Sequence, residues 1–451
     1  MKSPATRKYS PSIISVFVLL ALIALIAACG TTGNTTANAG TKNSTQPKGH
    51  VTATTQPNGK GHVTPIATTQ PSNQPTRNGS TSQPNSTTPI AGPQEGSTNA
   101  CSGTSGLSTI RMLNTTQGWA SNQTAVFTTS DGGHTWKCVT PAGMQTQTGV
   151  IGDFMDASHA WITADLLAGG NTISIWRTSD GGQSWQSSTI SANEPQVGDA
   201  PHFVNTQDGW LEVINGGPGA GSESAEIFQT TDGGQTWNVV ANTNNSASGL
   251  PAEGLKTGIS FKDTLNGWAT GTDASNTPWL YVTHDGGKTW QKQTLPDLPG
   301  AIGTAATAIS YQTTPPVFFG NTGLLPVFIT GQLAQNQPVN GFLLYHTTNG
   351  GQSWYTDWKS NPATLTSFAT NQNELYIADP LHAWAGVANS NAIYATSDGG
   401  ESWQELGTHF GPASDISFVN PSDGWAFLSN VGPVSTIDGG VNWKILMYNY
   451  A

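Results

Sequence analysis

One eight-residue pattern, Thr-x-(Asp/Asn)-Gly-Gly-x-(Thr/Ser/Asn)-Trp, occurs seven times in this chain of 451 residues. Successive copies are 40 to 64 residues apart at the acidic position, a period typical of architectures that repeat one small sheet. The third positions are Asp131, Asp180, Asp232, Asp285, Asn349, Asp398 and Asp438. The closing tryptophans are Trp136, Trp185, Trp237, Trp290, Trp354, Trp403 and Trp443.

A second motif, Gly or Ala followed by Trp, precedes six of the seven copies, and it ends at Trp119, Trp161, Trp210, Trp268, Trp384 and Trp425. An apolar residue stands seven positions before five of these tryptophans, at Met112, Phe154, Phe203, Phe261 and Phe418, and Tyr376 stands eight before the sixth. In the fifth copy we expect Phe328 to take the place of this Trp. Each unit is therefore predicted to contain four strands, with the Asp-Gly-Gly turn between the third and the fourth.

Seven such units predict an all-β chain folded as a seven-bladed β-propeller of four-stranded antiparallel blades. The composition agrees, because 10% charged residues beside 53 Gly, 27 Pro and 16 Trp do not suit a helical bundle. A β-solenoid or a string of hairpins is the alternative. A closed ring is favoured because it buries both faces of every sheet.

The glycines and the carboxylate of the repeat have a structural explanation. Gly-Gly supplies positive φ in a tight turn, and the Asp carboxylate accepts hydrogen bonds from nearby N–H and hydroxyl groups. We therefore interpret the repeated Asp and Trp residues as structural rather than catalytic.

The N-terminus predicts a secreted lipoprotein. Basic Lys2, Arg7 and Lys8 precede an apolar run that ends in Ala27-Ala28-Cys29-Gly30, so residues 1–28 are interpreted as a signal peptide and Cys29 as the lipidated first residue of the mature chain. A plain transmembrane anchor is the alternative, although the run is short for a bilayer span. The protein is then expected at the cell membrane, lipid-anchored and facing the extracellular side or the periplasm.

Residues 29–100 are almost entirely Thr, Asn, Gln, Ser, Pro and Gly, which predicts a disordered tether before a propeller spanning residues 101–451. Residues 101–451 carry 9 Lys and Arg against 26 Asp and Glu, a net charge of 9 − 26 = −17. Nucleic acid is therefore not expected as a partner, and the membrane is expected as one only through the lipid anchor.

Cys101 and Cys138 are the two cysteines that remain after Cys29. In an oxidising compartment they are predicted to form a disulfide, with two buried free thiols as the alternative.

The octapeptide resembles the Asp-box, or BNR repeat, found in sialidases, sortilin-type receptors, several glycoside hydrolases and the photosystem II assembly and stability factors. Over residues ~106–451 the combination with Gly-Trp-Ala is most similar to the last family. That resemblance implies a non-enzymatic binding or assembly scaffold for a protein or glycan ligand, without a cofactor or a metal.

A carbohydrate-active glycoside hydrolase is the alternative function, and whether the chain is an enzyme stays open. Sialidases resemble one another in an arginine triad, whereas residues 101–451 hold only Arg111 and Arg177. A glycosidase of another kind needs two carboxylates at a defined distance. Asp153, Asp199, Asp263 and Asp415 lie near predicted inner strands, but they have no distinctive spacing, so no catalytic residue is assigned.

The distance from the second-strand aromatic residue to the acidic position is longest in the middle repeats. The extra residues are expected in loops between the second and third strands, at 166–171, 215–223, 272–278 and 332–340, with the long connection 296–316 beside them. These loops should project on the face opposite the Asp-boxes, where we predict that the ligand binds on blades two to five. The alternative is that the length of these loops varies without any consequence for ligand binding.

Overall fold

The structure is a computed structural model that describes residue 101 and most of the chain after it. The described ranges are 106–144, 149–164, 170–192, 195–197, 199–219, 222–275, 277–297, 306–333, 338–356, 375–387, 391–406, 412–428, 431–447 and 449–450. The predicted signal peptide, Cys29 and the predicted tether lie outside these ranges.

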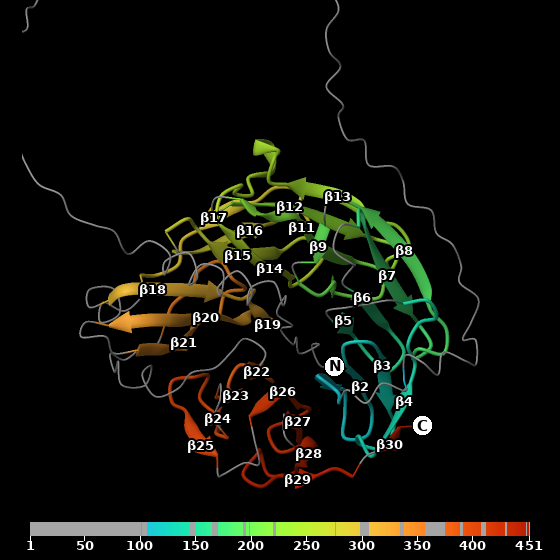
Figure 1. Cartoon of the computed structure of the whole chain (residues 1–451). Coiled ribbons are helices and arrows are strands. Elements are labelled where there is room, and N and C mark those ends of the chain that lie inside the picture. The colour runs from blue at the N-terminus through green and yellow to red at the C-terminus, as the bar shows by residue number, and fades with distance from the viewer. Residues whose placement is uncertain are drawn as a thin grey trace, which may run out of the picture. The chain divides into compact units, whose positions relative to one another are not determined.

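The described residues form a seven-bladed β-propeller, as predicted, and Figure 1 shows its sheets following one another around a common centre. Blade one contains β1 (Thr109–Met112), β2 (Gly118–Ser121), β3 (Val126–Thr129) and β4 (Thr135–Cys138). Blade two contains β5 (Val150–Phe154), β6 (Ala160–Ala164), β7 (Thr172–Thr178) and β8 (Gln186–Ser191). Blade three contains β9 (Pro195–Val197), β10 (His202–Phe203), β11 (Gly209–Gly219), β12 (Ser222–Thr230) and β13 (Asn238–Asn242).

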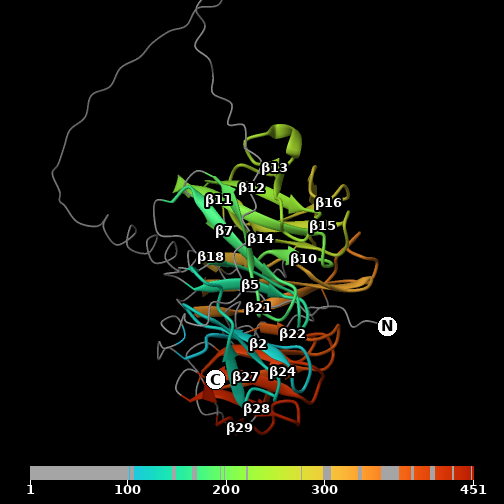
Figure 2. The same ribbon diagram turned by 90° about the vertical axis from the view of Figure 1, so that its right-hand side faces the viewer.

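Blade four contains β14 (Leu255–Phe261), β15 (Gly267–Thr272), β16 (Pro278–Thr283) and β17 (Gln291–Gln293). Blade five contains β18 (Ala306–Thr313), β19 (Val317–Phe319), β20 (Thr322–Leu333) and β21 (Pro338–Thr347). Blade six contains β22 (Leu375–Ile377), β23 (Ala383–Gly386), β24 (Ile393–Thr396) and β25 (Gln404–Leu406). Blade seven contains β26 (Ala413–Phe418), β27 (Gly424–Leu428), β28 (Gly432–Thr436) and β29 (Lys444–Ile445), and β30 (Asn449–Tyr450) follows it. Figure 2 shows the short 3-10 helix η1 (Ser246–Ser248) standing out beside β13.

The glycine of the Gly-Trp motif is required by a close approach. In blade three Phe203 pairs with Gly209 across the first two strands, and a Cβ at Gly209 would lie 2.6 Å from the Phe203 ring. Gly267 and Gly424 face Phe261 and Phe418 in the same register. The missing side chain thus lets the aromatic ring lie flat over the second strand.

Seven hydrophobic cores hold the ring together, one at each interface between blades. The core between blades three and four shows the arrangement: Trp210 stacks on Phe261 of the next blade at 3.8 Å between ring centroids, and Phe261 meets Trp290 edge-on at 6.0 Å. Such aromatic pairs stabilise by about 0.5–1.5 kcal/mol beyond their burial. Each Asp-box Trp therefore packs toward the preceding blade.

The ring is closed by contacts between blades seven and one that link the two ends of the described chain. Strand β30 pairs in parallel with the outer strand β4 and becomes the fifth strand of blade one (Figure 1). On the inner strands, the backbone N–H of Ile110 donates to Asp415 at 2.7 Å and that of Met112 donates to Ser417 at 3.0 Å. The repeat pattern did not predict this additional strand.

Blade five corrects one sequence assignment. Phe318 pairs with Gly323, as Phe203 pairs with Gly209, so Leu324 rather than Phe328 occupies the second-strand Trp position. The sequence comparison missed this because the first strand is interrupted at Pro315 and Pro316, which divide it into β18 and β19. In blade six, likewise, Ile377 and not Tyr376 occupies the apolar position, since Ile377 pairs with Ala383.

The extra residues of blades three and five are mostly strand and not loop, which corrects the expectation from their length. In blade five, β20 and β21 pair from Gly323–Thr347 out to Gln332–Pro338. In blade three, β11 and β12 pair beyond Asn215–Ser224, and β9 adds a strand along β11. The hairpins of these two blades are therefore extended, and the first strands continue beside them.

Candidate binding site

Each Asp-box builds its own turn through hydrogen bonds to the side chain at the acidic position. In blade three the Thr230 hydroxyl and the Thr236 N–H donate to Asp232 Oδ1 at 2.8 and 2.9 Å, and the Thr236 hydroxyl donates to Oδ2 at 2.7 Å. Gly233 and Gly234 adopt φ of 74° and 86°, which only glycine tolerates easily. The carboxylate is thus engaged within the turn that it stabilises.

The two departures from the repeat preserve these bonds. Asn349 accepts from Ser353 N–H through Oδ1 at 3.0 Å and donates from Nδ2 to the Ser353 hydroxyl at 2.8 Å. In blade seven, Asn442 Nδ2 donates to Asp438 Oδ2 at 2.8 Å, where other copies use a hydroxyl. An amide at either position can therefore replace one hydroxyl–carboxylate bond.

The same hydrogen bonds affect the acid strength of the carboxyls. Partial burial of Asp232 raises its pKa, but the N–H and hydroxyl of Thr236 and the Thr230 hydroxyl outweigh it and hold the pKa below its usual range. At Asp438 the dominant cause of a lowered pKa is the N–H of Asn442, followed by the Asn442 side chain. These carboxylates are kept ionised, which suits hydrogen-bond acceptors and not general acids.

All seven Asp-Gly-Gly turns bind the turn between the first two strands of their own blade. The first glycine donates its N–H to a carbonyl of that turn, as in Gly132 to Thr116 at 2.8 Å and Gly439 to Ser422 at 2.9 Å. Both kinds of turn consequently share one face, called here the Asp-box face. The hairpins between second and third strands emerge on the opposite face.

The four carboxylates considered for a glycoside hydrolase all accept hydrogen bonds from backbone N–H groups. Asp153 accepts from Phe203 N–H of the next blade at 2.8 Å, and Asp415 accepts from Ile110 N–H. Asp199 accepts from Ala200 N–H at 2.7 Å. Asp263 lies just after the inner strand β14, where it caps the turn to β15 by accepting from the N–H groups of Leu265 and Asn266. Each of the four carboxylates therefore accepts a backbone N–H within the fold.

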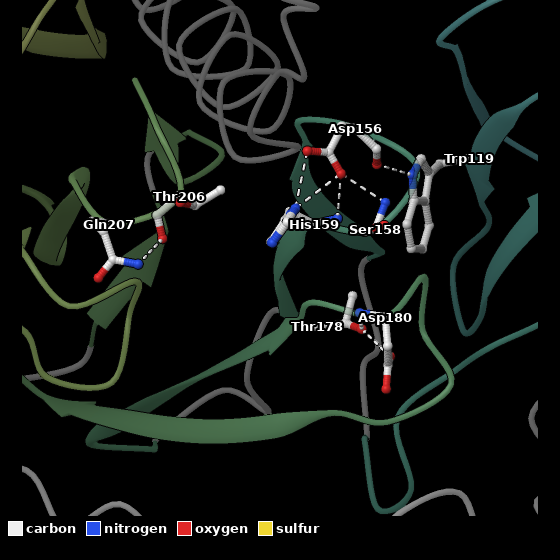
Figure 3. A network of polar contacts seen from close by, with 8 residues as sticks. All are labelled: Trp119, Asp156, Ser158, His159, Thr178, Asp180, Thr206 and Gln207. Atoms are coloured by element: carbon white, nitrogen blue, oxygen red, sulfur yellow. Dashed lines mark hydrogen bonds and ion pairs between the residues drawn. The ribbon is translucent and has the colours of Figure 1, made fainter.

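The clefts formed by the described residues include two that lie between blades on the Asp-box face. One of about 300 Å³ lies between blades one and two and includes Trp119, Lys137 and Asp180. Figure 3 shows its neighbourhood, where the Trp119 indole donates to the Asp156 carbonyl oxygen at 2.9 Å and Asp156 accepts from Ser158 and His159. Both clefts are assembled from residues of different repeats.

The second cleft, of about 260 Å³, lies between blades two and three. Its lining includes Arg177, one of the two arginines in residues 101–451. Arg177 donates to Gln186, while Thr206 and Gln207 belong to the opposing turn of blade three (Figure 3). Partial burial lowers the pKa of Arg177, and the negative charge of Asp232 counteracts part of that effect. The cleft offers amide and guanidinium donors, which suit peptide or hydroxyl groups.

The opposite face carries the extended hairpins of blades three and five. A buried polar cluster between blades three and four contacts the blade-three hairpin. Lys256 N–H donates to Glu223 Oε2 at 2.7 Å, and Lys256 Nζ donates to the carbonyl oxygens of Glu223, Ala252, Glu253 and Gly254 at 2.6 to 3.3 Å. Burial lowers the pKa of Lys256 and raises that of Glu223. The sequence analysis missed this cluster; Lys256 in an otherwise apolar and neutral first strand was the available signal.

Cys101 and Cys138 lie next to each other, with 6.2 Å between their Cα atoms. That separation falls within the roughly 4.4–6.8 Å that a disulfide spans. The bond itself stays a prediction. Within the described ranges no helix could serve as a membrane span, and no three His, Cys, Asp or Glu side chains are grouped so as to hold a metal ion.

The BNR/Asp-box repeat family matches residues 281–292, which contain the fourth Asp-box. The repeat is an Asp-box. Photosystem II assembly lipoprotein Ycf48 of Synechococcus sp. (strain CC9902) is 28% identical over 199 residues, 42% of this chain and 48% of that relative. The match thus spans less than half the length of the curated relative.

Two solved structures with a similar fold are also Ycf48 proteins. Ycf48 bound to D1 peptide is 15% identical with a TM-score of 0.45, and the similarity covers 76% of this chain and 93% of that one. Ycf48 from Cyanidioschyzon merolae is 16% identical with a TM-score of 0.45, covering 79% and 99%.

Proposed function

We propose that this protein is a non-catalytic, membrane-tethered scaffold that binds a protein ligand through the extended hairpins of blades three and five, opposite the Asp-box face. The observation that carries the proposal is the length of these hairpins. β11 and β12 contain 11 and 9 residues and β20 and β21 contain 12 and 10, whereas the second and third strands of blade one contain 4 each. Binding residues concentrate on such projections from rigid scaffolds.

The buried cluster beneath blade three supports the same surface. Lys256 of blade four ties the 252–254 segment to the start of β12, at the outer end of the hairpin, and Ser222 pairs with Gly254 across the interface. The outer end of the extended blade-three hairpin is thereby held against the next blade. A preorganised surface loses less conformational entropy when a ligand binds.

The relative named above supports an assembly role and the predicted lipid anchor, because it is called an assembly lipoprotein. The Asp-box carboxylates favour a non-catalytic role, since each is committed to its own turn. Replacement of Cys29 by Ser should release the protein from the membrane fraction and abolish its labelling by a fatty-acid probe. Retention in the membrane without label would contradict the anchor.

The ligand site is tested by shortening one hairpin. Replacing residues 331–339 by Asn-Gly keeps the Thr330–Asn340 pair and removes the outer part of the blade-five hairpin. We expect the shortened protein to melt within a few degrees of the original and to lose cross-linking to its protein ligand on cell envelopes. The matched control, Gln207→Ala with Gln235→Ala, alters the cleft between blades two and three and should retain the ligand.

The reverse result, loss in the cleft variant and retention in the shortened one, would move the site to the Asp-box face. Capture of a polysaccharide instead of a protein would overturn the proposed ligand class and leave the scaffold role intact.

A further inference from the structure

The seventh Asp-box differs from the other six at the two positions that the repeat leaves variable. Between Thr and Asp the first six copies have Ser130, Ser179, Thr231, His284, Thr348 and Ser397, and the seventh has Ile437. After the two glycines they have His134, Gln183, Gln235, Lys288, Gln352 and Glu401, and the seventh has Val441. Six polar side chains at each position show that the fold does not need an apolar one there.

These apolar side chains are exposed, and two more exposed apolar residues follow them in the chain. Ile437 is 73% exposed, Val441 54%, Ile445 on β29 51% and Met447 84%. They are four of the seven large hydrophobic side chains that are exposed within the described ranges, and all four fall in 11 consecutive residues. We call these four residues the apolar edge. Exposed apolar side chains that gather in one short segment commonly mark an interaction surface.

We propose that the apolar edge contacts the lipid bilayer and inserts its aliphatic side chains at the membrane interface. Ile437 and Val441 project from a tight turn, Ile445 from the outer strand β29, and Met447 from the segment that follows it. Exposed Lys444 stands between Val441 and Ile445, and its ammonium can remain at the headgroup level while neighbouring side chains insert. Projecting aliphatic side chains fit a deformable lipid surface without a preformed complementary pocket.

The position of the edge in the ring agrees with this partner. Leu446, next to Met447, packs against Gly133 of blade one, and β30 then pairs with β4. The strand β4 also carries Cys138, beside which the chain enters the propeller at Cys101. Cys101, the described residue that follows the predicted tether in the chain, therefore lies beside the outer strand of blade one, with which the C-terminal strand β30 pairs.

Charge complementarity does not explain the contact, because the chain from residue 101 carries 9 basic against 26 acidic residues. Binding that rests on apolar insertion should persist or increase when salt is added, since salt screens the repulsion between an acidic protein and anionic lipid. Electrostatic binding would decrease.

The test uses the chain from residue 29 onward with Cys29→Ser, so that no acyl chain contributes, and vesicles of phosphatidylcholine and phosphatidylglycerol. We expect this protein to co-sediment with the vesicles in low and high salt. Ile437→Ser with Val441→Gln, which installs the residues of repeat two, should lower the partition coefficient about tenfold without a change in melting temperature. The control Leu265→Ser removes an exposed leucine of blade four and should bind as the parent does.

Absence of vesicle binding by the parent, or equal binding by the Ile437→Ser/Val441→Gln variant, would overturn the proposal. A dimer that this variant dissociates, in the absence of vesicle binding, would assign the edge to a second copy of the chain. The measurement does not involve the protein ligand of the extended hairpins, so its failure leaves the proposed function unaffected.

Discussion

The indole N–H of Trp425 in blade seven donates to the carbonyl oxygen of Gly132 in blade one at 2.9 Å. Trp161, Trp210 and Trp384 make the same bond to the first glycine of the next Asp-box, at 2.8 to 2.9 Å. The interface between blades seven and one, where the two ends of the described chain meet, therefore uses the same hydrogen bond as three other interfaces between blades. The side chain of Leu324 has no N–H group, so Leu324 cannot make this bond in blade five.

Replacement of Trp425 by Phe should weaken the closing seam. The ring retains an aromatic side chain but loses the donor to Gly132, and a net hydrogen bond is worth about 0.5–1.5 kcal/mol. Chemical denaturation should show this decrease in the free energy of unfolding. Trp161→Phe, which removes the equivalent bond in the middle of the ring, should cost a similar amount; an unchanged midpoint for both variants would contradict the role of the bond.

Substitution of an Asp-box carboxylate should reduce stability and leave ligand binding unchanged. Asp232→Ala removes the acceptor of Thr230 and Thr236, at an expected cost of about 1–3 kcal/mol. Asp232→Asn should cost less, because Asn349 already performs this role in blade five. Ligand binding is measured well below the melting temperature, and a selective loss there would mean that the box contacts the ligand.

Acid should destabilise the propeller through the Asp-boxes. At Asp398, partial burial raises the pKa, but the hydroxyl and N–H of Ser402 and the Thr396 hydroxyl lower it more. A carboxyl whose folded pKa lies below its unfolded value, about 3.9, contributes stability above that value and loses it as the pH falls through the folded pKa. The free energy of unfolding should therefore decrease below about pH 4. Asp398→Asn should reduce this pH dependence, and an identical profile would contradict the assignment.

Lys256→Met should destabilise strongly. It removes the ammonium bound to four carbonyl oxygens and leaves Glu223 buried without its charged neighbour, for which the usual cost is about 3–5 kcal/mol. The control is Lys262→Met in the same blade, where Nζ reaches the Gly350 carbonyl oxygen at 3.4 Å and a loss of about 0–1 kcal/mol is expected. Equal melting temperatures would show that the buried cluster does not stabilise this interface.

Cys101 and Cys138 are predicted to be linked, and the sequence separation of 37 residues sets the expected effect. A loop of this size corresponds to about 3–4 kcal/mol in the chain-entropy account of disulfides. Cys138→Ser should lower the melting temperature, and a thiol reagent under denaturing, non-reducing conditions should find no free thiol in the Cys29→Ser background. Two reactive thiols would favour the alternative of free cysteines.

The sequence by itself determined the class and number of blades. Asp-Gly-Gly turns and Gly-Trp motifs act within a blade, because the glycine conformation and the bonds of Asp131 to Thr129 and Thr135 involve residues only a few positions apart. Local spacing is therefore sufficient to predict them. It failed in blade five because Pro315 and Pro316 shift the register, so that Leu324 replaces Phe328 at the Trp position.

Only the tertiary structure decided which residues meet between blades. Lys256 and Glu223 are 33 positions apart and Asp415 and Ile110 are 305 apart, so local spacing does not show which residue each one contacts. The same holds for the clefts and for β30, whose parallel pairing with β4 joins the two ends of the described chain. These contacts form only when the ring closes, because closure brings segments that are distant in sequence next to each other. Closure requires all seven blades together, so no single repeat can predict it.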